Sequence, residues 1–392
     1  MNLTITPGVL SGDVAPPPSK SQAHRYLIAA ALAGERSEVR NQADSQDIWA
    51  TRRCMAELNT KSRSLPELDC GESGSTLRFL IPLALALRGG GVFTGRGRLM
   101  DRPQKPYFDI FDERGIWYEQ RDGVLTVEGR LAPGTYRLPG DVSSQFVTGL
   151  LYALPLLEGD SNILLTSPLE SRGYVDMTLE VLAKFGVRVE QEGERFHIPG
   201  PQRYAPAVVE VEGDWSQAAF WLAARDLGNP VRTRFSLEPS TQGDRRIMAF
   251  RVSMEHPGDV TLDVADYPDL VPPLAVIAAL RAGHATSLVN AARLRLKESD
   301  RLASVTAALN AMGAEVEEGP DFLRVRGRAA LAGGCTVDCC NDHRIAMMAA
   351  IAATRCREPV TLLGAECVAK SYPDFWEHYR MLGGVFHEHT GE

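Results

Sequence analysis

Six stretches of the sequence share one pattern, a polar opening followed by a helix rich in alanine and leucine. They begin near residues 18, 71, 140, 213, 266 and 340, at intervals of 53, 69, 73, 53 and 74 residues. The order 53, 69 in the first half returns as 53, 74 in the second half, which predicts two halves of three units each. A chain of 392 residues is long enough for two such domains, each with its own core.

A second pattern recurs three times with identical spacing. The glycine pairs 115/129, 186/200 and 313/327 lie 14 residues apart, and each pair encloses two short alternating segments. The first glycine is typical of a helix C-terminus with positive φ, and the alternating segments are typical of a hairpin. Chance similarity is the weaker explanation of this regularity. Each unit should therefore combine strands with two helices in an α/β (α+β) fold.

The break between the halves is expected near residues 211–214. We place a first three-unit domain at residues 16–212 and a second at residues 1–15 plus 213–392. The stretch before Pro16 is assigned to the second half because that half needs additional strands for symmetry. No low-complexity linker separates the two halves.

Composition narrows the functional classes. The net charge of −8 argues against nucleic acid and a basic membrane patch, and the apolar runs are too short for a membrane span. The N-terminus lacks the features of a signal peptide, and seven cysteines without a spacing pattern indicate reduced thiols in a cytoplasmic protein. Cys335, Cys339, Cys340 and His343 lack the paired spacing of a zinc site.

The polar openings are candidate anion sites. The first reads "PSKSQAHR" and contains Lys20, Ser21 and Arg25, and others read "ESGSTLR", "DVSSQF" and "NDHRIAM". A helix N-terminus offers unpaired N–H groups and a partial positive charge. Each opening alone is explained as well by an ordinary capped helix, with Ser21 as the expected cap of the first, but their repetition favours anion binding. The buried face of the first helix is expected to contain Leu27, Ile28, Ala31 and Leu32.

Two carboxylates have competing explanations. Asp269 in "DYPD" is most simply a helix-start carboxylate, and Glu298 lies three residues before Arg301 in a run typical of a solvated helix face. The residues alone therefore leave the roles of both carboxylates open.

Ten motifs along nearly the whole chain resemble the family of 5-enolpyruvylshikimate-3-phosphate synthases, also called 3-phosphoshikimate 1-carboxyvinyltransferases. They are "PPSKSQAHR", "GESGSTLRFL", "DRPQKP", "SSQF", "SRGYVD", "GDWSQAAF", "DYPDLVPPLA", "LRLKESDRL", "NDHRIAM" and "AKSYPDFW". The resemblance implies transfer of the enolpyruvyl group of phosphoenolpyruvate to the 5-hydroxyl group of shikimate 3-phosphate, with release of phosphate, in the shikimate pathway. It implies addition and elimination through a tetrahedral intermediate, without a metal or an organic cofactor.

The resemblance also implies a fold and a set of roles. The expected fold is two domains of three repeated βαβαββ units, with helix N-termini facing an interdomain cleft, in a monomer. The expected ligands of shikimate 3-phosphate are Lys20, Ser21, Arg25, Ser143, Ser144, Gln145, Ser171, Asp269 and Lys297, with Tyr174 nearby. The expected ligands of phosphoenolpyruvate are Lys20, Gly74, Arg102, Gln145, Arg301, Arg344 and Lys370. Asp269 would accept the hydroxyl proton, Glu298 would protonate the methylene carbon, and Lys20 would act beside them.

The sequence departs from the common family pattern at Glu72, Arg293 and Gln217. Two alternatives remain at this stage. One is the sister enzyme that uses UDP-N-acetylglucosamine, which usually carries a loop cysteine, whereas this chain has none between Gly71 and Gly334. The other is a non-catalytic binding protein for phosphorylated metabolites, which would not need Asp269 and Glu298 among cations.

Overall fold

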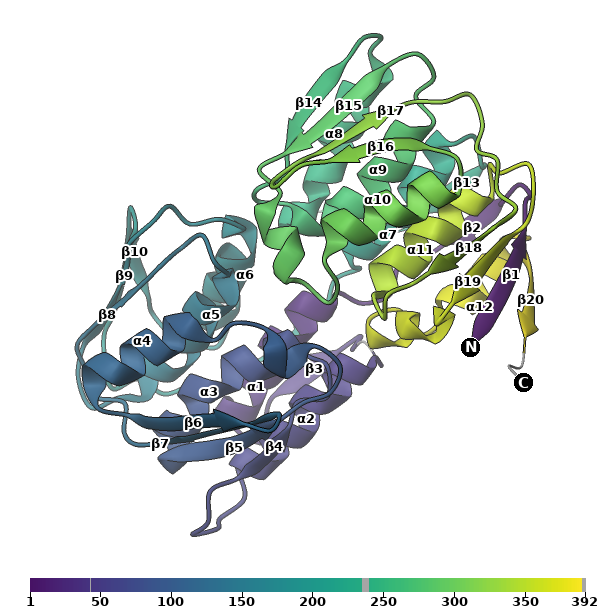
Figure 1. Ribbon diagram of the computed structural model, residues 1–392. Helices are drawn as coiled ribbons and strands as arrows, with labels where there is room; N and C mark the ends of the chain where they lie inside the picture. Colours follow the sequence, from purple (N-terminus) through teal and green to yellow (C-terminus); the bar gives the residue numbers. More distant parts are fainter. Residues whose placement is uncertain (43, 235–239, 390–392) are drawn as a thin grey trace. The chain divides into compact units, whose positions relative to one another are not determined.

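The computed structural model describes residues 1–42, 44–234 and 240–389 and divides into two compact units (Figure 1). The inserted unit is Pro18–Glu212, and the split unit combines Met1–Pro17 with Gly213–Glu392. The inserted unit therefore begins two residues after the expected position 16. Each unit has its own hydrophobic core, the first including Tyr26 and the second including Trp221.

The inserted unit contains two complete repeats with the element order βαβαββ. The first comprises β4 (Glu67–Asp69), α3 (Gly74–Arg88), β5 (Gly90–Thr94), α4 (Lys105–Arg114), β6 (Trp117–Arg121) and β7 (Val124–Glu128). The second comprises β8 (Thr135–Leu138), α5 (Ser144–Ala153), β9 (Ser161–Leu165), α6 (Arg172–Lys184), β10 (Glu190–Glu192) and β11 (Arg195–Ile198). Their sheet orders, β4-β5-β7-β6 and β8-β9-β11-β10, are equivalent, with the first pair of strands parallel and the others antiparallel.

The split unit also contains two complete repeats. One comprises β14 (Val260–Asp263), α9 (Val271–Ala279), β15 (Ala285–Val289), α10 (Arg301–Ala311), β16 (Glu315–Glu318) and β17 (Leu323–Arg326). The other comprises β18 (Cys335–Asp338), α11 (His343–Ala353), β19 (Val360–Leu363), α12 (Phe375–Met381), β20 (Val385–His389) and the N-terminal strand β1 (Asn2–Thr6). Here β1 lies between β19 and β20 and is antiparallel to both, so the start of the chain completes the last sheet (Figure 1).

The remaining repeat of each unit is shorter. It consists of α1 (Lys20–Ala33), β3 (Glu38–Arg40), α2 (Gln46–Leu58) and β12 (Val208–Glu210) in the inserted unit. Its counterpart in the split unit consists of β2 (Gly12–Val14), α7 (Trp215–Asp226), β13 (Val231–Thr233) and α8 (Ile247–Glu255). Within the described residues each of these repeats forms only a two-stranded parallel sheet. The hairpin that completes the other repeats is therefore not seen at these two places.

An arginine fixes the connection that follows each short repeat. Arg88, the last residue of α3, donates hydrogen bonds to the backbone carbonyls of Leu58, Thr60, Ser62 and Ser64, among others. Arg281, just after α9, donates in the same way to the carbonyls of Met254, His256 and Gly258. These carbonyls would otherwise be exposed in the segment that leads to the next repeat, so the two arginines have equivalent roles.

The three glycine-based hairpins are confirmed. Gly115, Gly186 and Gly313 end or follow their helices with φ of 66°, 74° and 94°, in the left-handed region that favours glycine. The segments after them form the pairs β6–β7, β10–β11 and β16–β17. The turn chemistry was thus readable from the spacing alone.

Candidate active site

The expected site residues divide between the two units. The inserted unit contains Lys20, Ser21, Arg25, Gly74, Arg102, Ser143, Ser144, Gln145 and Ser171. The split unit contains Asp269, Lys297, Glu298, Arg301, Arg344 and Lys370. Each group is described within its own unit.

The N-terminus of α1 differs from the expectation. Its cap is Ser19, whose Oγ accepts from the N–H of Gln22 at 3.4 Å, so the prediction of Ser21 as the cap was wrong. The helix begins two residues earlier than a cap at Ser21 would require, which leaves the Ser21 side chain available for other contacts. Lys20 forms an ion pair with Asp47 of α2, with 2.9 Å between Nζ and Oδ2.

The predicted buried face of α1 was partly wrong as well. Ile28 is fully buried, but Leu27, Ala31 and Leu32 are only half-buried. The fully buried positions instead include several polar side chains near the start of the helix: Gln22, His24 and Arg25. The first turns of α1 are therefore the most deeply packed part of that helix.

Arg25 is held in place by several neighbours. Its Nε donates to Thr178 Oγ1 at 2.8 Å, and its Nη2 donates to the Tyr174 carbonyl at 2.9 Å. Its Nη1 donates to the Ser21 carbonyl at 2.7 Å, and the guanidinium lies 5.2 Å from the centre of the Phe79 ring. Burial lowers the pKa of Arg25 to about 10, so the group is still charged at neutral pH. It is a buried cation that polar and aromatic neighbours hold in a preorganised position.

The N-terminus of α5 brings Gln145 to α3. Ser143 caps α5 by accepting from the Gln145 N–H at 3.3 Å. The Gln145 side chain accepts from Arg78 Nη1 at 2.8 Å and donates to Ser75 Oγ at 3.0 Å. Ser144, the first residue of α5, is almost fully buried. The openings of two different repeats are thereby connected through side chains.

Gly74 and Arg102 lie in direct contact. A Cβ atom added to Gly74 would be only 2.5 Å from Nη1 of Arg102, so the Arg102 guanidinium would have to move if any other residue replaced Gly74. Arg102 is 9% exposed, and its Nε has no hydrogen-bond partner within the described residues. A buried donor without a partner next to a helix N-terminus is suited to an anionic ligand.

Ser171 has an unusual backbone conformation. It precedes α6 with φ of 56° and ψ of 42°, the left-handed region that non-glycine residues rarely adopt. Its side chain is nearly buried, and its carbonyl accepts from the Tyr174 N–H at 3.0 Å. Strain of this kind persists where the surrounding structure requires it and is frequent at binding sites.

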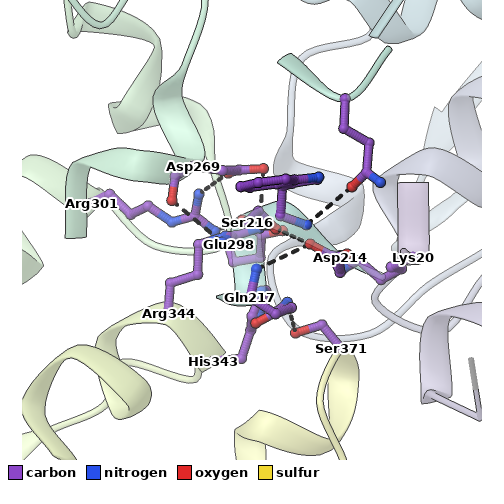
Figure 2. A network of polar contacts seen from close by, with 12 residues as sticks. Lys20, Asp214, Ser216, Gln217, Asp269, Glu298, Arg301, His343, Arg344 and Ser371 are labelled. Carbon is purple, nitrogen blue, oxygen red and sulfur yellow. Dashed lines mark hydrogen bonds and ion pairs between the residues drawn. The ribbon is translucent and has the colours of Figure 1, made fainter. Parts of the chain in front are cut away.

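In the split unit, Arg301 lies at the centre of a polar network (Figure 2). Its Nε is 2.8 Å from Oδ2 of Asp342, its Nη1 is 2.8 Å from Oδ1 of Asp269, and its Nη2 is 2.6 Å from Oε2 of Glu298. The Arg301 side chain is 1% exposed. It is the first residue of α10, so Glu298 lies before the helix, and the buried Arg301 is not part of the solvated helix face that the charge run suggested. The three carboxylates raise the pKa of Arg301 above its usual value against the opposing effect of burial.

Arg344 connects the openings of three helices. Its Nη2 lies 3.1 Å from Oδ2 of Asp269 and 3.0 Å from the Ser216 hydroxyl of α7. Asp214 caps α7 and accepts from Ser216 and from the N–H of Gln217 (Figure 2). The N-terminal ends of α7, α9 and α11 therefore meet inside the split unit.

Charge in this group alters two pKa values. Burial raises the pKa of Asp269, but the cations Arg344, Lys297 and Arg301 outweigh burial and hold that pKa below its usual value. Burial lowers the pKa of Lys297 to about 8, assisted by Arg301 and opposed by Asp269. Asp269 is thus ionised at neutral pH, whereas the pKa of Lys297 lies close to neutral pH.

Lys370 is buried at the end of this group. It is 4% exposed, and its Nζ donates to the carbonyl of Asn341 at 2.6 Å. Cys340 and Asn341 have φ of 52° and 50°, two consecutive left-handed residues before the start of α11. This turn directs the Asn341 carbonyl to Lys370.

Asp342 and Asp47 were missed by the sequence reasoning. Asp342 is fully buried, accepts from Arg301 and from Ser299, and caps α11 by accepting from the N–H of Arg344 at 3.0 Å. It therefore positions both arginines. The sequence signal for Asp342 was its place in "NDHRIAM", two residues before Arg344. For Asp47 the sequence offered no signal beyond its place at the start of a helix.

The structure shows the contacts of Gln217, one of the departures from the family pattern. Gln217 is buried and donates to Ser371 Oγ at 3.1 Å, close to Lys370 in the sequence.

Within residues 1–42, 44–234 and 240–389, no group of three or more His, Cys, Asp or Glu side chains could hold a metal ion. In the same residues, no helix combines the length and the hydropathy needed to cross a membrane.

Similarity to solved structures defines the class of fold. An EPSP synthase from Acinetobacter baumannii matches with a TM-score of 0.80 at 23% identity, covering 99% of this chain and 100% of that one. The enolpyruvyl transferase NikO from Streptomyces tendae matches with a TM-score of 0.76 at 18% identity, covering 98% of each chain. The protein thus has the architecture of the enolpyruvyl transferases.

Sequence similarity narrows this class to one family. The model of EPSP synthase (3-phosphoshikimate 1-carboxyvinyltransferase) matches residues 5–255 and 241–379. The 3-phosphoshikimate 1-carboxyvinyltransferases of Clostridium acetobutylicum and Clostridium kluyveri are 44% and 45% identical, over 98% of this chain and 98% of each relative. The chain belongs to the EPSP synthase family. The family and fold class expected from the motifs are therefore confirmed, and with them an enzyme of the carboxyvinyl transferase type.

Proposed function

We propose that this protein transfers the enolpyruvyl group of phosphoenolpyruvate to the 5-hydroxyl group of shikimate 3-phosphate and releases inorganic phosphate. One observation supports this beyond family membership: a chain with net charge −8 buries a set of cations at or near helix openings. These are Arg25, Arg102, Arg301, Arg344 and Lys370. Small substrates with several negative charges are the ligands that such cations recognise.

The reaction has two balanced steps. In the addition, the 5-hydroxyl oxygen bonds to C2 of phosphoenolpyruvate, its proton passes to a base, and the methylene carbon C3 gains a proton. In the elimination, C3 loses a proton, the C2–O bond to phosphate breaks, and phosphate leaves with the electron pair. Both steps need placed acids and bases and a fixed arrangement of two substrates.

The inserted unit supplies most of the proposed ligands of shikimate 3-phosphate. Lys20 and Arg25 would provide charge, and hydroxyl groups at the helix openings would complete the contacts with the phosphate group and the ring: Ser21, Ser143, Ser144 and Ser171. The Arg25 guanidinium is already fixed by Thr178 and Tyr174, so little conformational freedom is lost on binding. The Nε of Arg102, which has no hydrogen-bond partner in the described part of the chain, is a proposed donor to phosphoenolpyruvate.

The split unit supplies the proposed acid and base. A carboxylate with a lowered pKa is a weak base, and Asp269 is paired with both Arg301 and Arg344. We infer that the anionic groups of phosphoenolpyruvate compete for these two arginines. Asp269 would then lose its partners, its pKa would rise, and it would accept the hydroxyl proton only after the second substrate has bound.

Glu298 is the proposed donor of the proton to the methylene carbon. It shares Arg301 with Asp269 and is partly exposed, with 22% of its side chain accessible. Lys297 and Lys370 would neutralise the charge that develops on the transferred group. We expect the enzyme to act as a monomer in the cytoplasm, which sedimentation and cell fractionation would check.

A phosphate-release assay tests the proposal. Purified protein with phosphoenolpyruvate and shikimate 3-phosphate should release phosphate in the presence of a chelator. Release with UDP-N-acetylglucosamine, and none with shikimate 3-phosphate, would assign the protein to the sister reaction instead. Binding of both substrates without phosphate release would favour the non-catalytic alternative.

A further inference from the structure

A chain of hydrogen bonds runs through the interior of the inserted unit and connects three helices. His24 of α1 contacts Thr51 of α2, with 2.7 Å between Nδ1 and Oγ1. Thr51 contacts Thr76 of α3, with 2.6 Å between the two Oγ1 atoms. Thr76 donates to the Ser73 hydroxyl at 2.7 Å, and Ser73 is the N-cap of α3. All four side chains are fully buried.

The two ends of this chain lie beside residues of the proposed active site. His24 is on α1 between Lys20 and Arg25, and Ser73 immediately precedes Gly74. The four side chains have no place in the ligand set or in the acid–base chemistry proposed above. A buried polar chain needs an explanation, because apolar side chains of the same shape would fill this space without desolvation cost.

The hydrogen count along the chain determines the tautomer of His24. Thr76 gives its hydroxyl proton to Ser73, so Thr76 accepts in its contact with Thr51. Thr51 therefore gives its own proton to Thr76 and accepts in its contact with the imidazole. The proton of a neutral His24 consequently lies on Nδ1, and Nε2 has only a lone pair.

The surroundings of the imidazole agree with a neutral ring. Nε2 is buried and has no hydrogen-bond partner in the part of the chain that the structure describes. Burial lowers the pKa of His24 well below its usual value, and the charges of Lys20 and Arg25 lower it further. The ring edge packs against Phe79 in a T-shaped arrangement, with 6.5 Å between ring centroids. A charged imidazole would find no counterion among the contacts described here.

We propose that His24 is a positioning residue that fixes the N-terminus of α3 relative to α1, through Thr51 and Thr76. Hydrogen bonds of defined direction specify one rotation of α3 about its axis, whereas an apolar contact would tolerate several. The N-cap sets where the free N–H groups at Gly74 point, and a displacement of about 1 Å in a reacting geometry costs about 100-fold in rate. The inference rests on the proposed function for the assignment of Gly74 to phosphoenolpyruvate.

Loss of this chain of hydrogen bonds should affect the binding of one substrate more than the binding of the other. Arg25 is also held by Thr178 and Tyr174, and Lys20 is also held by Asp47, so the shikimate 3-phosphate ligands on α1 have independent anchors. The cap of α3 depends on Thr76 and Ser73 alone among these contacts. The effect should therefore fall mainly on phosphoenolpyruvate.

Three variants of the full-length enzyme test the proposal. His24→Asn places an amide nitrogen where Nδ1 lies and keeps the donor to Thr51, His24→Gln moves the amide to the position of Nε2, and Thr51→Val removes the contact with little change of shape. We expect His24→Gln and Thr51→Val to raise the KM for phosphoenolpyruvate by about 10- to 100-fold. The dissociation constant of shikimate 3-phosphate should stay within about threefold, and His24→Asn should resemble the unaltered enzyme.

The control is Thr286→Val in the split unit. Thr286 is fully buried and accepts from Arg281 at 2.8 Å, so its substitution costs a buried hydrogen bond away from the proposed ligands. It should lower the melting temperature without changing the KM for phosphoenolpyruvate. If His24→Gln and Thr51→Val behave like Thr286→Val, or if His24→Asn is as impaired as His24→Gln, the proposal is wrong.

A measurement on the unaltered protein does not depend on the variants folding. The ¹⁵N resonances of His24 should show a protonated Nδ1 and an unprotonated Nε2 that do not change between pH 6 and about 8. A proton on Nε2, or titration of the ring in this range, would overturn the proposal. This outcome is separate from the proposed reaction, which only the phosphate-release assay can refute.

Discussion

At the scale of single residues, the structure bears on which of two roles Glu298 has. The sequence left two roles open, an acid for the methylene carbon or an ion-pair partner of Arg301, and the 2.6 Å contact between Glu298 and Arg301 is compatible with both. Arg301 is also paired with Asp269 and Asp342, so it does not need Glu298 to be neutralised. This surplus of carboxylates favours a chemical role for the most exposed of the three.

Glu298→Gln separates the two roles. An amide keeps the shape and the hydrogen bond from Arg301 but cannot give up a proton. If Glu298 is the acid, turnover should fall by roughly 10²- to 10⁴-fold with substrate binding retained. Exchange of solvent deuterium into the methylene group should fall by more than the turnover.

A matched exposed glutamate provides the control. Glu315 pairs with Arg326 and Arg328 on the surface of the same unit, and Glu315→Gln should leave turnover unchanged. Full deuterium exchange in Glu298→Gln would transfer the donor role to Lys20 or Asp269. Asp269→Asn should impair turnover by a similar factor, because it removes the proposed base.

We expect Lys297 to make the reaction sensitive to alkaline pH. Its pKa of about 8 means that the ammonium loses its proton as the pH rises through that value. If the charge is needed for substrate binding, kcat/KM, which reports the free enzyme, should decline above pH 8. Lys297→Arg should remove this limb because a guanidinium stays charged, and Lys105→Arg on the surface should not.

The lowered pKa of Lys297 predicts that stability rises with pH, whereas kcat/KM should fall. The pKa of Lys297 is lowered from 10.5 by folding, so between about pH 8 and 10.5 the folded protein binds fewer protons than the unfolded chain. The contribution of this residue to the free energy of unfolding therefore rises with pH across that window. For activity, a decline of kcat/KM above pH 8 that persists in Lys297→Arg would show that another group controls the decline.

At the scale of helices and strands, much of the fold was readable from the sequence. The helix openings and the glycines at 115, 186 and 313 carry local signals, because capping and positive φ depend on residues next to each other. Burial near the start of α1 was not readable, since Arg25 and His24 look like surface residues and are buried only through partners from α2, α3 and α6. The contact between Asp342 and Arg301 was hidden for the same reason, because Arg301 belongs to α10, whereas the cap that Asp342 forms on α11 is local.

The two short repeats also escaped the sequence analysis. The Clostridium acetobutylicum relative aligns over 420 positions, more than the 392 residues of this chain, so relatives contain segments without a counterpart here. We expect these segments at the two places where the described sheets have two strands in place of four. In that case Arg88 and Arg281 would act as substitutes that tie down a shortened connection.

Arg88→Met tests this substitution at the element scale. The variant loses hydrogen bonds from a charged donor to several backbone carbonyls, so the free energy of unfolding should fall by about 1–3 kcal/mol. The catalytic constants should stay unchanged, because Arg88 is at the opposite end of α3 from Gly74. Arg98→Met, at an exposed position, is the control and should change stability by less than about 0.5 kcal/mol. Equal stability of both variants would contradict the role of Arg88.

At the scale of the whole molecule, one unit is inserted into the other. The inserted unit is continuous from Pro18 to Glu212, has its own core, and closes on itself through the hydrogen bond from the Ser19 N–H to the Glu212 carbonyl at 2.7 Å. The split unit continues across the same point through the bond from the Asp214 N–H to the Pro17 carbonyl at 2.8 Å. A domain whose ends are adjacent is suited to independent folding.

A fragment of residues 18–212 should therefore fold alone. It contains most of the proposed ligands of shikimate 3-phosphate, so it should bind that compound weakly, and the Arg25→Met fragment should not. It lacks Asp269 and Glu298 and should release no phosphate. Calorimetry and a cooperative melting transition would measure both properties, and a fragment without a transition would show that the inserted unit depends on the rest of the chain.

The position of β1 has a consequence for how the protein is made. A ribosome completes β1 first and its neighbours β19 and β20 last, so Leu3 and Ile5, which are fully buried in the finished sheet, stay without partners during almost the entire synthesis. The inserted unit has all its strands once Glu212 has emerged and can become protease-resistant on the nascent chain. The split unit becomes resistant only after β19 and β20 have emerged, and until then its first strand is a hydrophobic segment that chaperones can bind.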